Sequence, residues 1–286
     1  MTNIKNSIPQ LATKALLYEA NLYPKPGLVD PIDPGAHQDM DIYTFLDSIV
    51  ALAPFFKAYC EAGLQHEGNI LELFEKLRQI GVQAEIEMFQ ATENINTHKG
   101  ANFSFAVILG ASGYYIKKYS ITHFTEKETT GILEIVKEMT AHLVKNDLQN
   151  LDTNEALTHG EKLYLKKGRT GIRGEAAAGY PALQHLLLPF LRENKTDDTE
   201  LLLLRALTLL MSEVEDANIL YRGGEAAWQK IKKESKEIFN TRTTKKPLKE
   251  KLFIYNETLK KRHLSPGGAA DLLSLGIYFA LLENIF

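Results

Sequence analysis

The chain has 286 residues, of which 44% are hydrophobic and 24% charged, as is usual for a globular protein with a sizeable buried core. Its formal net charge of −3 provides no global positive field, so we expect no binding to nucleic acid and no attachment to an acidic membrane surface. The single cysteine, Cys60, excludes an internal disulfide and a thiolate zinc cluster and favours a cytoplasmic location.

Helical periodicity dominates the sequence, whereas the alternation of β-branched residues that would indicate strands is scarce. In the segment 41–62, Phe45, Ile49, Leu52 and Phe56 recur at spacings of three and four residues, which predicts one apolar helix face. No proline- or serine-rich linker divides the chain, so we expect a single all-α domain over residues 1–286, with ten or more helices. The predicted helices lie at 8–22, 41–62, 69–91, 101–118, 127–148, 153–166, 175–192, 198–219, 224–239, 247–261 and 267–284.

The first unusual joint between helices is PKPGLVDPIDPGAHQDMD, at 24–41. It is long for a connection in a compact domain and contains several apolar side chains, which favours a packed, functional loop. We expect it to present Lys25 and Asp30 to a site. Either Asp39 or Asp41 can cap the following helix, which leaves the other acid for Mg²⁺ binding or for general base catalysis.

The next joint, NTHKGAN, places His98 and Lys99 directly before an apolar helix. A histidine in this position can donate a proton or bind a triphosphate. The alternative is that His98 has only a structural or solvated role, as most single histidines near helix ends do.

The stretch KKGRTGIRGEAAAGYP, at 166–181, combines regularly spaced glycines with arginines before a predicted helix. Glycines let backbone N–H groups approach an anion, and arginine donors match phosphate oxygens. We predict a phosphate site here, against the alternative of a glycine-rich turn with solvated arginines. Its residues are Gly168, Gly171, Gly174, Arg169 and Arg173.

In SEVEDANILYRGG, Glu213 and Asp216 are three residues apart and would share a face of a continuous helix, where they could bind Mg²⁺ directly or through water. The alternative is a polar helix face turned to solvent.

In LSPGGAADLL, Ser265 is the predicted N-cap and Pro266 the first helical residue. Gly267 and Gly268 would then expose N–H groups to an anion, and Asp271 would lie about one turn into the helix, where it could approach a metal or a hydroxyl group. A well-capped helix explains the serine and the proline, but not two glycines in its first turn.

Together these joints resemble one family: the triphosphoribosyl-dephospho-CoA synthases of citrate lyase activation (CitG type) and their malonate decarboxylase counterpart. The resemblance spans residues 19–280 and rests on six segments that occur in the family's order. They are PKPGLVD, GAHQDMD, NTHKGAN, GEKLYLKKGRTGIRGEAAAG, EDANILYRGG and LSPGGAADLL.

The resemblance implies a reaction between ATP and 3′-dephospho-CoA. A ribose hydroxyl of dephospho-CoA would attack C1′ of the ATP ribose, and adenine would leave. The product would be the precursor of the citrate lyase prosthetic group, which a separate transferase would load onto the acyl carrier protein. The sequence leaves open whether the client is citrate lyase or malonate decarboxylase, and whether the chain is a monomer or a homodimer.

The implied chemistry assigns roles to the residues of the joints. The triphosphate must be gripped but not cleaved, and one acid must accept a proton while others bind Mg²⁺. His98 or His37 could assist the departure of adenine. Candidates for the grip are Lys25, Lys99, Arg169, Arg173, Gly171, Gly174, Ser265, Gly267 and Gly268, and the acids are Asp39, Asp41, Glu213 and Asp216, with Asp39, Glu213 and Asp216 as metal ligands.

Two other functions fit the same residues. One is a nucleotide or ADP-ribose N-glycosidase, in which water replaces dephospho-CoA as the acceptor. The other is a nucleotide or CoA sensor without catalysis, which would not require the clustered acids.

Overall fold

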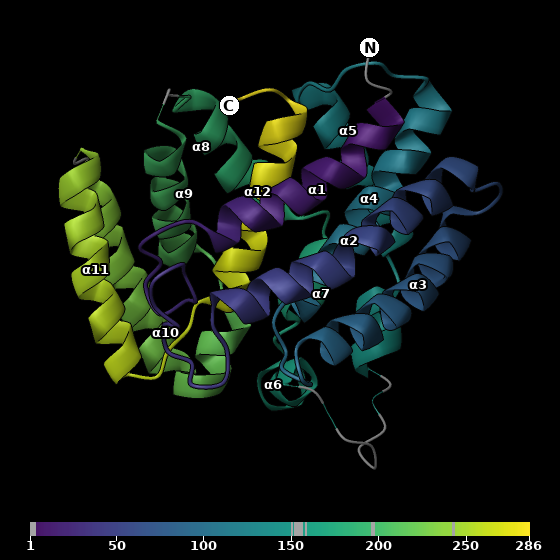
Figure 1. Cartoon of the computed structure of the whole chain (residues 1–286). Helices are drawn as coiled ribbons and strands as arrows, with labels where there is room; N and C mark the ends of the chain where they lie inside the picture. The colour runs from purple at the N-terminus through teal and green to yellow at the C-terminus, as the bar shows by residue number, and fades with distance from the viewer. Residues whose placement is uncertain (1–3, 150, 152–156, 158, 196–197, 242–243) are drawn as a thin grey trace.

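The computed structural model describes residues 4–149, 151, 157, 159–195, 198–241 and 244–286. Within this part of the chain it contains helices and no strand (Figure 1). The prediction of an all-α fold is therefore confirmed. None of the described helices combines the length and the apolar character needed to cross a bilayer.

The helices follow one another along the chain as antiparallel and crossing neighbours. Two short segments with π-helical hydrogen bonding, η1 and η2, interrupt them. Their order is α1 (Ile4–Ala20), α2 (Ile42–Gln65), α3 (Ile70–Ala91), α4 (Lys99–Tyr119), α5 (Glu126–Met139), η1 (Lys145–Gln149), α6 (His159–Lys167), α7 (Gly171–Ala177), η2 (Leu183–Leu187), α8 (Leu188–Glu193), α9 (Thr199–Glu213), α10 (Ala217–Asn240), α11 (Lys245–Lys261) and α12 (Gly267–Leu282).

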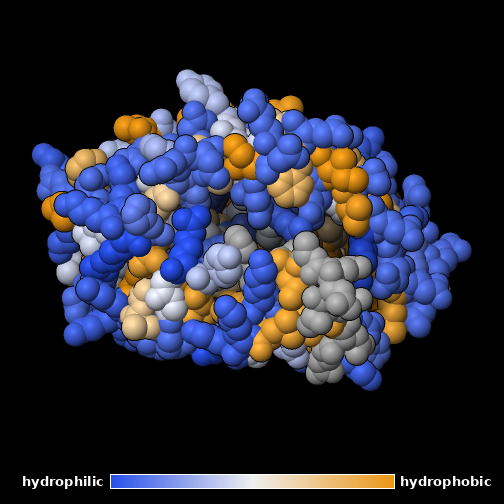
Figure 2. All heavy atoms as spheres, turned by 90° about the horizontal axis from the view of Figure 1, so that it is seen from below, coloured by the Kyte–Doolittle hydropathy of each residue, from blue (hydrophilic) through white to orange (hydrophobic). Residues whose placement is uncertain are grey.

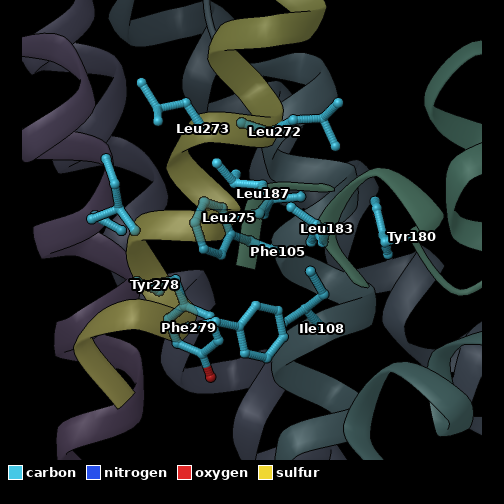
Figure 3. Close-up of a cluster of buried hydrophobic side chains, with 14 of the residues drawn as sticks. Phe105, Ile108, Tyr180, Leu183, Leu187, Leu272, Leu273, Leu275, Tyr278 and Phe279 are labelled. Carbon is cyan, nitrogen blue, oxygen red and sulfur yellow. The ribbon is translucent and has the colours of Figure 1, made fainter. Parts of the chain in front are cut away.

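Helices α4 and α12 form the centre of the molecule. Helix α12 is apolar on all sides, which is the pattern of a helix that is buried all round. It packs against α1, α4, α8 and α9. In Figure 3, Phe105 and Ile108 of α4 face the Tyr278 and Phe279 region of α12, and the rings of Phe105 and Tyr278 meet edge to face at 5.9 Å.

The loop between α1 and α2 is packed, as predicted, and its organiser is Asp30. The buried carboxylate of Asp30 accepts backbone N–H groups from Lys25, Ile32 and Asp33 at 3.2, 3.0 and 2.9 Å. Lys260 of α11 bonds the side chain of Asp33 at 2.6 Å, which holds the loop beside α11 (Figure 1). The expectation that Asp30 faces a site is therefore wrong, because its acceptors are used inside the loop.

Several helices differ in their bounds from those that the periodicity predicts. The predicted helix 198–219 stops at Glu213, because Val214 is extended and Asp216 caps a new helix. The predicted helix 175–192 is broken by positive φ angles at Gly179 and Tyr180. The prediction at 127–148 is divided between α5 and η1, and that at 153–166 lies partly outside the described residues. The prediction at 224–239 matches the second part of α10, because non-helical φ and ψ angles at Gly224 kink the helix where the prediction begins.

Candidate active site

A cavity of about 1040 Å³ lies where the unusual joints converge. Its walls come from the loop before α2, the N-terminal ends of α4 and α12, and parts of α1, α3, η1, α6, α7 and α10. Figure 2 shows the face of the molecule at this end, which is mostly hydrophilic and recessed near its middle. The volume is at the upper end of the range for small-molecule sites, so this cavity is the candidate active site.

Asp271 of α12 lines the cavity, and we call the part of the cavity around its carboxylate the floor. Its carboxylate has neither a hydrogen-bond partner nor a cation beside it in the described part of the chain, and its charged neighbours are the acids Glu19 and Asp216. Burial, and then these two acids, raise the pKa of Asp271 well above its usual range. Such a carboxyl takes up a proton at a higher pH than an ordinary aspartate does.

Gly100, the second residue of α4, makes room for this carboxylate. A Cβ at this position would lie only 2.2 Å from Oδ2 of Asp271. The glycine of NTHKGAN therefore places the start of α4 directly against the acid of α12.

One of the two acids that act on Asp271, Glu19, belongs to a buried ion pair. Lys25 Nζ bonds Glu19 Oε1 at 2.6 Å, and the two side chains are only 1% and 4% exposed. Both residues line the cavity, Glu19 from α1 and Lys25 from the loop that Asp30 organises. The positive charge of Lys25 is thus already matched by Glu19.

Asp216 lies behind the floor and joins two helix N-termini. As the N-cap of α10 it accepts the backbone N–H groups of Asn218 and Ile219 at 2.9 and 3.1 Å. Its other oxygen accepts the N–H of Ala269 in α12 at 3.0 Å. Burial raises the pKa of Asp216 to about 6, although these N–H groups act in the opposite direction.

The two glycines that begin α12 are explained by packing rather than by an anion. A Cβ on Gly267 would lie 2.5 Å from the Asn218 side chain, and one on Gly268 would lie 3.0 Å from Asp216. The N–H of Gly268 also donates to Asp216. The amides of Gly268 and Ala269 are therefore engaged and do not form the predicted phosphate cradle.

His98 is buried at the start of α4 and borders the cavity. Its Nδ1 lies 2.7 Å from the hydroxyl of Ser48 in α2, which in turn accepts a hydrogen bond from Thr97 at 2.7 Å. Burial, with a smaller effect of Lys25, lowers the pKa of His98 to about 3. The imidazole is therefore neutral near pH 7, and its Nε2 is enclosed within the protein.

His37 forms a second polar contact at the cavity wall. Its Nε2 lies 2.9 Å from Ser265 Oγ, and its Nδ1 is 3.9 Å from the exposed carboxylate of Asp39. Burial and the charge of Arg222 lower the pKa of His37, and Asp39 opposes them. Ser265 is not the predicted N-cap, because α12 begins after Pro266 and the serine hydroxyl meets His37 instead.

A group of cations that we call the cationic wall lines the cavity from α3, α6 and α7. Its members are Arg78, Lys162 and Arg173. Arg78 and Arg173 both pair with Asp147 of η1, the latter at 3.5 Å from its Nε. The predicted glycines Gly171 and Gly174 line the same part of the cavity. Arginine and lysine donors here match the chemistry of a polyphosphate.

The other two cations that we predicted to bind the triphosphate, Lys99 and Arg169, lie in different places. Lys99 lines the cavity and pairs with Glu85 of α3. Arg169 is not among the residues that line it: its guanidinium pairs with Glu215 and Glu225. Of the two arginines in KKGRTGIRG, only Arg173 therefore reaches the cavity.

Two predicted acids lie away from the floor. Asp41 is exposed and caps α2 by accepting the N–H of Thr44 at 3.0 Å. Glu213 ends α9 and bonds Lys236 at 2.9 Å. The predicted magnesium site of Asp39, Glu213 and Asp216 is not formed, because no three potential metal ligands come together among the described residues.

Comparison with known proteins identifies the family. The family model described as ATP:dephospho-CoA triphosphoribosyl transferase (CitG) matches residues 5–286. The chain belongs to the CitG family.

CitG relatives with curated names match the chain along almost its whole length. A probable 2-(5''-triphosphoribosyl)-3'-dephosphocoenzyme-A synthase of Streptococcus mutans is 49% identical over 98% of this chain and 97% of its own length. Proteins of the same name from Streptococcus equi subsp. zooepidemicus and Streptococcus pyogenes are 49% and 47% identical, over 98% and 99% of this chain and 97% and 98% of their own lengths. No solved structure matches the chain.

Two residues of the floor carried signals that the sequence analysis did not use. Asp271 is the only charged residue in the 16 residues of α12. Glu19 falls on the buried face of α1, at helical spacing from Ala12, Ala15 and Leu16. A charge on a buried face is costly unless it has a partner or a function. Arg78 and Lys162 gave no such signal, because they lie on amphipathic helices where charges are expected.

Proposed function

We propose that the cavity binds ATP and 3′-dephospho-CoA together, and that Asp271 is the general base that activates the attacking hydroxyl. The observation that carries this proposal is the position of Asp271: it lines the cavity, is partly exposed to it, and its carboxylate forms no hydrogen bond and no ion pair within the described part of the chain. A structural aspartate would use its oxygens as Asp30 and Asp216 do. A carboxyl with a raised pKa is suited to accept a proton near neutral pH.

The acceptor would place its ribose at the floor. The names of the relatives put the new bond at position 2 of dephospho-CoA, so the nucleophile is the 2′-hydroxyl. In the transfer, the bond between O2′ and C1′ of the ATP ribose forms while the bond from C1′ to adenine breaks. The proton of the 2′-hydroxyl goes to Asp271, and the bonding electrons go to adenine.

The triphosphate of ATP would lie along the cationic wall. Arg78, Lys162 and Arg173 offer donors there, and Lys99 lies nearby at the start of α4. Asp147 and Glu85 pair with three of these cations, so phosphate oxygens would compete with these carboxylates as their partners.

The floor would also favour positive charge on the ATP ribose. Breaking the bond to adenine leaves a cation-like ribose, which nearby carboxylates stabilise. Of the two histidines, His37 is the better placed to assist the departing adenine, because its side chain lines the cavity and is 13% exposed, whereas the side chain of His98 is buried. His98 stays neutral and enclosed, and ties α4 to α2 through Ser48.

Mg²⁺ would enter as part of the ATP complex. The described residues do not fit a resident metal site, whereas Mg²⁺ is often held mainly by substrate phosphates and water. No step of the mechanism above is assigned to the ion.

The family implies two further features that we include in the proposal. The product would pass to a separate transferase that loads the acyl carrier protein of a client enzyme such as citrate lyase. Because ATP and dephospho-CoA are intracellular metabolites, the reaction would occur in the cytoplasm.

Substitution of Asp271 tests the assignment of the base. Asp271→Asn should lower kcat by about 10² to 10⁴, the usual contribution of a general base, and leave the Kd of dephospho-CoA little changed. Glu213→Gln is the matched control, since it removes the same charge outside the cavity, and should keep wild-type kcat. A kcat for Asp271→Asn within a few-fold of wild type would exclude Asp271 as the base.

A further inference from the structure

We propose that Asp271 and Glu19 make the site selective for an acceptor without a 3′-phosphate, so that the floor rejects coenzyme A. This inference rests on the proposed function and extends it to the choice between two closely related substrates. It concerns the charge of the floor and the position of the acceptor ribose.

The floor is an acidic environment. Asp271, Glu19 and Asp216 lie close enough that the latter two act on the charge of the first, and Lys25 is the cation of this group in the described chain. Lys25 is held by Glu19 at 2.6 Å and is 1% exposed. The charges that act on Asp271 are therefore negative.

A phosphate would also find few hydrogen-bond donors at the floor. The backbone N–H groups of Gly268 and Ala269, which could have held an anion, already donate to Asp216. The side chain of Asn218 lies against Gly267. The cations that line the cavity lie elsewhere: Arg78, Lys162 and Arg173 form the cationic wall, Lys99 pairs with Glu85, Lys25 pairs with Glu19, and Arg222 acts on His37. None of them is among the charges that act on Asp271. The cavity thus has one region suited to phosphates, the cationic wall, and another suited to uncharged hydroxyl groups, the floor.

The geometry of the acceptor brings its 3′ position to this floor. A general base must lie about 3 Å from the hydroxyl that it deprotonates. The 2′ and 3′ carbons of a ribose are neighbours, so a 3′-phosphate would lie within roughly 6 Å of Asp271 whenever the 2′-hydroxyl is in place. At that separation, in a partly buried site, a negative charge on the phosphate and the ionised form of Asp271, which is the form that acts as a base, oppose each other by about 100-fold in binding. The 3′-hydroxyl of dephospho-CoA carries no such charge.

Titration calorimetry of the full-length protein with dephospho-CoA and with CoA tests the inference. In the wild type, the Kd of CoA should exceed that of dephospho-CoA by at least about 100-fold. Asp271→Asn removes one negative charge from the floor and should reduce this ratio at least about tenfold, mainly through tighter binding of CoA. Glu213→Gln makes the same change in net charge on the surface and should keep the wild-type ratio.

Two results would overturn the inference. One is a wild-type protein that binds CoA as tightly as dephospho-CoA, and the other is a ratio that Asp271→Asn leaves unchanged. If the wild-type protein binds dephospho-CoA and converts it to product, but Asp271→Asn leaves the ratio of the two Kd values unchanged, only the inference about selectivity fails. If dephospho-CoA does not bind the wild-type protein at all, the proposed function fails with it.

Discussion

Replacement of Gly100 by alanine should displace the proposed base without unfolding the protein. The new Cβ would lie 2.2 Å from Oδ2 of Asp271, whereas ordinary contacts begin at 3.4 Å. The carboxylate must therefore move by at least about 1 Å, and a misplacement of this size in an active site costs about 100-fold in rate. Because the clash is with the end of a side chain, and because alanine favours the helix, stability should change little.

The assay for Gly100→Ala combines steady-state kinetics with thermal unfolding. We expect kcat to fall about 100-fold while Tm stays within a few degrees of wild type. Gly81→Ala is the matched control: it also borders the cavity, but its Cβ would lie 3.7 Å from the hydroxyl of Tyr59, an ordinary contact. A Gly100→Ala enzyme with wild-type kcat would refute the placement of Asp271 at the reacting atoms.

Two further predictions follow from the cationic wall and from Asp216. Arg173→Met should raise KM for ATP about tenfold or more, because a charged contact to phosphate is lost. Arg169→Met, in the same loop but outside the cavity, should leave KM unchanged. Equal effects of the two substitutions in steady-state kinetics would contradict the assignment of the cationic wall. The folded-state pKa of Asp216, about 6, exceeds its ordinary value of 3.8, so its contribution to stability is complete below pH 3.8 and is lost as the pH rises through 6. Urea unfolding should therefore show about 2 kcal/mol less stability at pH 7.5 than at pH 4 from this group, a difference that Asp216→Asn removes. The same pH dependence in wild type and Asp216→Asn would show that Asp216 is not its source.

Much of the fold could be predicted from hydrophobic periodicity, because most helices bury one continuous apolar face. The errors fall where local geometry overrides periodicity. Leu210 to Ile219 reads as one amphipathic run, but the extended backbone at Val214 and the capping by Asp216 divide it into α9 and α10. Such a break depends on side-chain hydrogen bonds that a hydropathy pattern does not contain.

The sequence predicted which joints between helices form the candidate site, but not how their side chains are arranged within it. The glycine-rich and charged joints do converge on one cavity, yet the roles within it differ from those suggested by residue type. Asp216 is of a residue type that binds metals, but its carboxylate accepts four backbone N–H groups. The carboxylate of Asp271, in a helix that otherwise looks like core, accepts none. Whether an acid is occupied or available depends on contacts between α10, α12 and α4, which are distant in sequence.

The most direct test of the account is the release of adenine by the purified protein with ATP and Mg²⁺, followed by chromatography in the presence and absence of 3′-dephospho-CoA. The account predicts adenine release only with dephospho-CoA, matched in amount by a triphosphoribosyl adduct, and loss of both in Asp271→Asn. Adenine released equally without the acceptor would contradict it and would instead indicate an N-glycosidase that uses water.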